Sequence, residues 1–120
     1  MATINSFTSL EQSRKLAKIL PLESADMVYW AGEYITHPYM EGQHKDEQIP
    51  IWSLASLLDI IPKHIKDYNV LRIDISENDT SIWYDEIGYG VNNDLPDITM
   101  ESTIDACYEM IIRLNELKLL

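Results

Sequence analysis

The sequence is poor in cysteine and glycine, and each shortage excludes a type of site. Cys107 is the single cysteine, so an intramolecular disulfide and a four-cysteine zinc site are both excluded. A lone cysteine also fits a reducing compartment. With 4 glycines, the chain holds no glycine-rich phosphate loop and no Gly-x-Ser-x-Gly elbow, and it also lacks a His-Glu-x-x-His motif. Familiar hydrolases and nucleotide-using enzymes are therefore disfavoured.

Positive charge is scarce as well, with 9 Lys and Arg against 20 Asp and Glu and a net charge of −11 at pH 7. Nucleic acids and anionic membranes attract clustered cations, so this balance argues against direct binding to either of them. No stretch approaches the roughly 18 apolar residues of a membrane span. Residues 1–7 carry neither positive charge nor an apolar run, so we expect no signal peptide and a cytoplasmic protein.

What is present is the composition of one globular domain. Of the 120 residues, 46% are hydrophobic and 24% are charged, which is close to the averages of folded soluble proteins and argues against disorder. A chain of this length buries roughly two thirds of its unfolded surface, enough for a core without metal or disulfide crosslinks. We expect a single α+β domain over residues 1–120.

The strongest helix signal covers residues 102–117. Apolar side chains recur there every three or four positions, as on one face of an amphipathic helix. Ser102 can cap the start of this helix, with Asp105 three residues further on. The face expected in the core is made of Ile104, Cys107, Ile111 and Leu114.

Two further helices are predicted upstream. Residues 52–61 carry a stripe of leucine and isoleucine, which Pro62 ends because proline cannot continue a helix. Residues 9–20 begin with a capping-box sequence in which Thr8 pairs with Glu11, and a proline ends this helix too. Sequence signals therefore bound both helices.

Strand signals fall between these helices. Residues 70–76 alternate apolar and polar side chains, and residues 81–87 are rich in aromatic and β-branched side chains. Asn78-Asp79 between them predicts a tight two-residue turn, because both residue types tolerate a positive φ. The two segments are predicted to form a β-hairpin.

A second predicted hairpin lies earlier in the chain, where residues 27–30 and 33–36 flank Ala31-Gly32. The element order is then helix, hairpin, helix, hairpin, helix (α-ββ-α-ββ-α). Hairpins give antiparallel pairing, whereas single strands that alternate with helices give parallel pairing. We therefore expect an α+β fold with an antiparallel sheet of about four strands and three helices packed mainly on one face.

A two-residue turn at Asn78-Asp79 fixes a strand register. It pairs Ile75 with Ile82 and Ile73 with Tyr84 on alternate rungs of the ladder. These pairs should face the core, because Leu71, Ile73 and Ile75 form a wholly apolar stripe along the first strand. The polar positions of that strand should then lie on the opposite face.

The polar face of this hairpin is the candidate interaction surface. The register places Arg72 opposite Asp85 and Asp74 opposite Trp83, which leaves Trp83 partly exposed and diagonally across from Arg72, where a cation–π contact can form. A tryptophan among charges is a common anchor of protein interfaces. The alternative is that another layer of structure covers it.

Two polar stretches have spacings that suggest a metal ion. Residues 74–85 resemble the oxygen-ligand spacing of a calcium loop, but they lack its glycine and are flanked by predicted strands instead of helices. His37, His44 and Asp46 lie in one polar loop, with a spacing that matches no familiar zinc template. We expect a hairpin turn and a solvated loop at these places, and neither a metal nor another cofactor.

No catalytic residue is predicted either. Cys107 lies on the apolar face of the last helix, where it fits a buried hydrophobic residue better than a nucleophile, which would need a base and a lowered pKa. Twenty acids make neighbouring carboxylates such as Asp85-Glu86 inevitable, and sequence spacing does not show two acids converging in a cleft.

Several phrases of the sequence occur together in one group of proteins. They are SFTSLEQS at 6–13, LPLESADM at 20–27, WSLA at 52–55 and DACYEM at 105–110. The chain resembles, over nearly its whole length, small uncharacterised acidic proteins of unknown function that are common in genomes and prophage-like elements of gut anaerobic bacteria. The resemblance implies a bacterial, single-domain, cytoplasmic product of a mobile element. It transfers no functional residue.

Three classes of function remain open. The first is a non-enzymatic adaptor or inhibitor that binds another protein, since strong negative charge speeds docking onto a basic partner. The second is a small enzyme or ligand-binding domain, which needs a pocket that the sequence does not show. The third is a DNA-mimicking or immunity-type protein whose carboxylates imitate phosphates. A homodimer is compatible with each of them, and acidity can also serve solubility alone.

Overall fold

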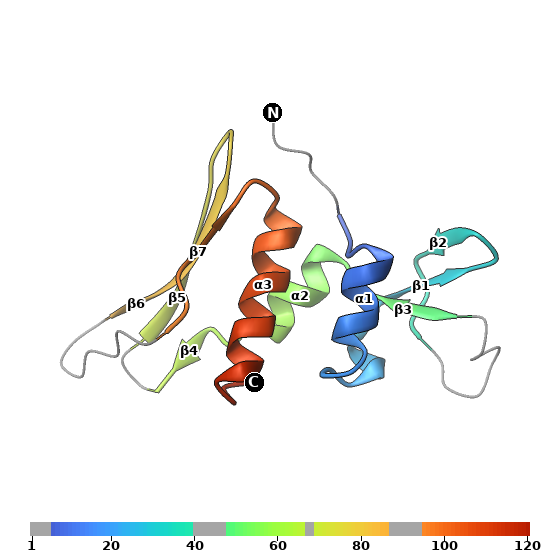
Figure 1. The fold of residues 1–120 in the computed structure, drawn as a ribbon, viewed down its shortest axis with the longest axis horizontal. Helices are drawn as coiled ribbons and strands as arrows, with labels where there is room; N and C mark the ends of the chain where they lie inside the picture. Colours follow the sequence, from blue (N-terminus) through green and yellow to red (C-terminus); the bar gives the residue numbers. More distant parts are fainter. Residues whose placement is uncertain (1–5, 40–47, 67–68, 87–94) are drawn as a thin grey trace. The chain divides into compact units, whose positions relative to one another are not determined.

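The structure, a computed structural model, describes residues 6–39, 48–66, 69–86 and 95–120 (Figure 1). These residues form three α-helices, one 3-10 helix and seven strands. The strands make two antiparallel sheets, of three and four strands, so the predicted α+β class is confirmed. The structure does not confirm a single sheet of about four strands or the exact order of elements, because three short strands were not predicted.

The chain divides into two compact units, and each has its own sheet. Ser6–Ile60 form the N-terminal unit, and Ile61–Leu120 belong to the C-terminal unit. The prediction of one domain over residues 1–120 stays a prediction.

In the N-terminal unit, one helix packs on one edge strand of a three-stranded sheet. The strand order is β2-β1-β3, and α1 contacts β3. Trp52, directly after β3, is fully buried, and its indole N–H donates to the Ser24 hydroxyl at 2.9 Å. The elements of this unit are α1 (Leu10–Leu16), the 3-10 helix η1 (Leu22–Ser24), β1 (Met27–Trp30), β2 (Glu33–Ile35), β3 (Ile49–Ile51) and α2 (Leu54–Ile60).

The hairpin of β1 and β2 is confirmed as predicted. Trp30 pairs with Glu33 across the two-residue turn, and Ala31 and Gly32 both have positive φ, 53° and 81°. Two positive φ angles are those of a type I′ turn, whose twist matches the twist of the flanking strands. Glycine adopts such an angle freely, whereas Ala31 adopts it against the preference of its Cβ.

The start of α1 differs from the prediction by one residue. The N-cap is Ser9, which forms a capping box with Gln12, in place of Thr8 with Glu11. Thr8 is instead fully buried, where its hydroxyl accepts from the Trp52 backbone N–H at 3.2 Å and lies 2.7 Å from the Ser13 hydroxyl. A tertiary contact therefore uses the side chain that the local pattern assigned to the cap.

In the C-terminal unit, one long helix packs on one face of the second sheet. The strand order is β4-β5-β6-β7, and α3 contacts β6 and β7 (Figure 1). Ser102 caps α3 as predicted, by accepting the Asp105 backbone N–H at 3.3 Å. The predicted core face of the helix is confirmed, since Ile104, Cys107, Ile111 and Leu114 are at most 1% exposed. The elements are β4 (His64–Ile65), β5 (Asn69–Ile75), β6 (Thr80–Glu86), β7 (Ile98–Met100) and α3 (Thr103–Glu116).

The predicted register of the β5–β6 hairpin is wrong by two residues. Ile73 pairs with Ile82, Ile75 pairs with Thr80, and the loop has four residues. Neither Asn78 nor Asp79 has the positive φ that a two-residue turn would need. Ser76 closes the longer loop instead: its backbone N–H and its hydroxyl donate to the backbone and side-chain oxygens of Asp79, both at 2.8 Å.

A shift of two residues keeps every side chain on its predicted face, because successive side chains of a strand alternate between the two faces. Ile82 and Tyr84 are buried on the helix side, as predicted. Ile75 is 64% exposed, so its predicted place in the core is wrong. The longer loop leaves Ile75 at the outer end of the hairpin, opposite Thr80 and beyond the apolar pairs.

Candidate protein-interaction surface

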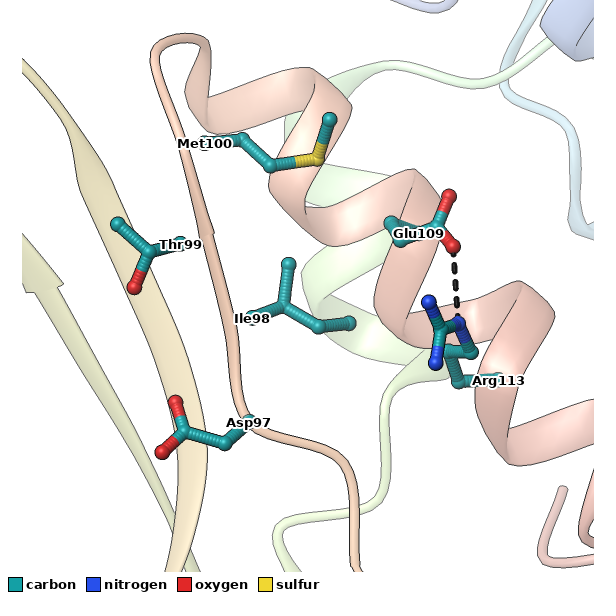
Figure 2. Close-up of a pocket in the computed structure, with 6 residues that line it drawn as sticks. All are labelled: Asp97, Ile98, Thr99, Met100, Glu109 and Arg113. Atoms are coloured by element: carbon teal, nitrogen blue, oxygen red, sulfur yellow. Dashed lines mark hydrogen bonds and ion pairs between the residues drawn. The ribbon is translucent and has the colours of Figure 1, made fainter.

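The second sheet has one face turned away from α3. Figure 2 shows Ile98 and Met100 of β7 pointing toward the helix, and Thr99 pointing away from it. Thr99 pairs with Ser81 of β6, so these two residues lie on that second face. We call it the open face, since α3 is the one helix among the described residues of this unit. Its members are His64, Val70, Arg72, Asp74, Ser81, Trp83, Asp85 and Thr99, because residues that pair across strands share a face.

The open face contains all four residues of the candidate surface, in a different arrangement from the predicted one. Arg72 lies directly opposite Trp83, whereas the prediction placed it opposite Asp85. Arg72 Nε nevertheless lies 3.5 Å from Asp85 Oδ2, one diagonal step away. Asp74 lies opposite Ser81. The predicted cross-strand pairs are therefore wrong. The role of these residues in binding stays a prediction.

The ion pair on this face contributes little to stability. The side chains of Arg72 and Asp85 are 51% and 53% exposed, and exposed pairs of this kind contribute at most about 1 kcal/mol. The pair instead holds two opposite charges next to Trp83, with Arg72 across the ladder and Asp85 further along the same strand, at a place that solvent reaches. Such charges can exchange their partners for those of a bound protein.

Negative charge dominates the hairpin that carries this face. Between Asn69 and Glu86 there are five acidic residues and a single arginine, a net charge of −4, and two of these acids, Asp74 and Asp85, lie on the open face with Arg72. Asp97, immediately before β7, adds another exposed carboxylate. A surface of this sign attracts cationic partners and repels nucleic acid.

Trp83 is half-buried, so acrylamide should quench its fluorescence to an intermediate degree. The component of emission that is lost in Trp83→Phe should be quenched more strongly than that of Trp52, which is fully buried. Stern–Volmer titrations of the wild type, of Trp83→Phe and of Trp52→Phe measure this difference. A lost component that acrylamide cannot reach would place Trp83 in the core and remove it from the surface.

A groove lies on the helix side of the second sheet, between β7 and α3 (Figure 2). Its volume is about 300 Å³, and the Glu109–Arg113 pair of the helix lies across it from β7, with Arg113 Nε donating to Glu109 Oε1 at 3.0 Å. A second cavity of about 290 Å³ shares Arg113. The groove is lined by Asp97, Ile98, Thr99, Met100, Glu109 and Arg113.

Sequence reasoning missed this groove because it missed β7. A strand of three residues is too short for alternation to stand out, and the order Ile-Thr-Met was its one signal. Of the two carboxylates that line the groove, Asp97 is exposed to solvent and Glu109 is already paired with Arg113. This lining suits side chains of a docked protein better than acid–base catalysis, which needs two titratable groups with separated pKa values.

The two stretches considered for metal ions have different outcomes. The Ser76–Asp79 hydrogen bonds form a polar turn within residues 74–85, as expected. His44 and Asp46 lie outside the described residues. Among the residues that the structure describes, no three His, Cys, Asp or Glu side chains are grouped so as to hold a metal ion.

Cys107 should react with thiol reagents only when the protein opens. It is fully buried, and burial raises the pKa of its thiol to about 11, although the Lys63 charge opposes the shift. The reactive thiolate is therefore scarce at pH 8, and the reagent cannot reach it. Absorbance with Ellman's reagent should show slow labelling in buffer and immediate labelling in guanidinium. Rapid labelling of the native protein would contradict the burial of this face of α3.

Raising the pH should destabilise the C-terminal unit through the same burial. Burial raises the pKa of both Cys107 and Tyr84, whose hydroxyl donates to the Pro62 carbonyl at 2.6 Å. Burial favours the neutral forms in the folded state, so below pH 9 neither group changes the free energy of unfolding with pH. As the pH rises from 9 to 11, the Cys107 thiol ionises more readily in the unfolded chain than in the folded one, and the free energy of unfolding falls. Urea unfolding at pH 8 and pH 10.5 measures the loss, and Cys107→Ala should reduce it.

None of the helices in the described part of the chain is long and apolar enough to cross a membrane. Comparisons of the chain with protein-family models, with curated proteins and with solved structures find no match.

Proposed function

We propose that the chain is a non-enzymatic protein that binds a basic protein partner, as an adaptor or an inhibitor, through the open face. One observation carries the proposal: Trp83 lies half-buried beside an exposed Arg72–Asp85 pair on a sheet face that bears a net negative charge. Tryptophan and arginine are the residues that most often dominate binding energy at interfaces. Cytoplasmic location and mobile-element origin belong to the same proposal.

The charge of the surface determines the chemistry of the partner. The hairpin carries four more negative than positive charges, so encounter with a cationic protein is accelerated and encounter with an acidic one is slowed. A basic DNA-binding protein or nuclease would satisfy this requirement, and the acidic face would then act as a DNA mimic. Competition by DNA for the same partner distinguishes this case from an ordinary adaptor.

Capture from a lysate of the source cells tests the proposal. Immobilised wild-type protein should retain a protein of net positive charge, identified by mass spectrometry, and the purified pair should bind with a Kd that rises with salt. Trp83→Ala should weaken binding about tenfold or more, whereas Tyr34→Ala, an exposed aromatic residue of the other unit, should not change it. Circular dichroism confirms that both variants fold.

Three results would contradict the proposal. They are the absence of any captured partner, a partner of net negative charge, and equal affinity for the wild type and Trp83→Ala. A partner that DNA displaces would favour mimicry. Turnover of a small molecule bound between β7 and α3 would favour the enzyme class instead.

A further inference from the structure

β7 is an edge strand of the second sheet in the part of the chain that the structure describes. It pairs with β6 on one side, and no other strand in the described part of the chain pairs with it. Unpaired backbone N–H and C=O groups at a sheet edge can accept another strand. The opposite edge, β4, is less suitable because it has two residues and is followed by Lys66, whose φ of 47° turns the chain.

The groove beside β7 provides space for the side chains of such a strand. A strand added to β7 continues the alternation of the sheet, so half of its side chains lie on the α3 side with Ile98 and Met100. The groove of about 300 Å³ lies on that side, with the Glu109–Arg113 pair as its far wall (Figure 2). The other side chains lie on the open face, next to Thr99.

Charge determines which strand fits. Asp97 and Glu101 flank β7, and both are exposed. If a second copy of the chain paired antiparallel about Thr99, Asp97 of each copy would lie opposite Glu101 of the other, and directly opposed like charges are destabilising. A segment with lysine or arginine at these positions places opposite charges there instead. The edge therefore favours a basic segment over self-association.

We propose that β7 accepts an extended segment of the partner, with alternating basic and apolar side chains, as a fifth antiparallel strand. The apolar side chains enter the groove against α3, and the basic side chains lie on the open face beside Asp97. This inference rests on the proposed function and specifies its mode: main-chain hydrogen bonds supply affinity, and the alternating side chains supply specificity.

A short peptide of alternating lysine and valine, with blocked ends, is the probe. It should bind the full chain, measured by calorimetry, about tenfold more tightly than a peptide with glutamate in place of lysine. Two N-methylated versions test the main chain. In an added strand every second N–H points to β7, so methylation of one alternate set should abolish binding, and methylation of the other set should leave it within about threefold.

Charge reversal tests the location. Asp97→Lys should weaken binding of the lysine peptide about tenfold and strengthen that of the glutamate peptide. Glu77→Lys, the same change at the exposed loop of the hairpin, is the matched control and should alter both affinities less than threefold. Circular dichroism verifies that each variant is folded.

The outcomes separate this inference from the proposed function. Equal binding of both methylated peptides, or no binding of the lysine peptide at up to about 1 mM, overturns strand addition at β7. The proposed function survives either result if Trp83→Ala still weakens the captured partner. If no partner is captured but the methylated peptides differ as expected, the edge accepts strands and the proposed function through the open face fails.

Discussion

Replacing Ile111 with alanine should lower the free energy of unfolding by about 2–5 kcal/mol. Ile111 is fully buried at the centre of the apolar face of α3. The substitution removes the transfer free energy of the lost methyl and methylene groups, and it leaves a cavity that the neighbouring side chains fill only in part. Urea unfolding followed by circular dichroism measures the change.

Leu117→Ala at the end of the same helix is the control for this experiment. Leu117 is 46% exposed, so its truncation should change the free energy of unfolding by less than about 0.5 kcal/mol. A similarly small effect of Ile111→Ala would show that this face of α3 is not part of the core. Comparable losses in both variants would instead indicate a general weakening of the helix.

The long helix could be predicted from the sequence because its signals are local and repeated. The 14 residues of α3 contain several turns of the same apolar spacing, and the serine that caps it directly precedes them. Each turn repeats the evidence of the one before, so the pattern identifies the buried face without knowledge of what packs on it.

The two hairpins show where local turn chemistry stops being sufficient. Gly32 reaches a positive φ without steric cost, so the β1–β2 turn followed from the sequence. Asn78 and Asp79 tolerate such angles without requiring them, and the Ser76–Asp79 hydrogen bonds stabilise a longer loop. The register error of two residues left the same side chains on the open face, because the face of a side chain depends only on alternation along the strand. It changed which residues pair across the two strands.

The missed features depend on contacts between distant parts of the chain. Thr8 and Trp52 are 44 residues apart, and their hydrogen bond moves the N-cap of α1 to Ser9. β3 contains Pro50, which argues against a strand when only the sequence is considered. β7 is defined by its contacts with β6 and α3, which lie elsewhere in the sequence. The groove beside it could therefore not be predicted from its three residues.

Asp26 connects the start of the first sheet to the start of α2. Its Oδ1 accepts the Ser53 backbone N–H at 2.9 Å, and its Oδ2 accepts the Ser53 hydroxyl. The hydroxyl oxygen of Ser53 in turn accepts the Ser56 backbone N–H at 3.2 Å, as the side chain of an N-cap residue does at the first turn of a helix. One carboxylate therefore holds the residue that caps α2, next to the fully buried Trp52.

Asp26→Ala should consequently lower the free energy of unfolding by about 2–4 kcal/mol, because it removes two hydrogen bonds to a charged group and frees the capping residue. Asp59→Ala removes the same group from an exposed position of α2 and should change stability by less than about 0.5 kcal/mol. Urea unfolding of the two variants, of Ser53→Ala and of Asp26→Ala/Ser53→Ala completes a double-mutant cycle. A coupling of about 1–3 kcal/mol is expected, since both residues act in one network. Additive losses would show that Asp26 stabilises the unit without acting through Ser53.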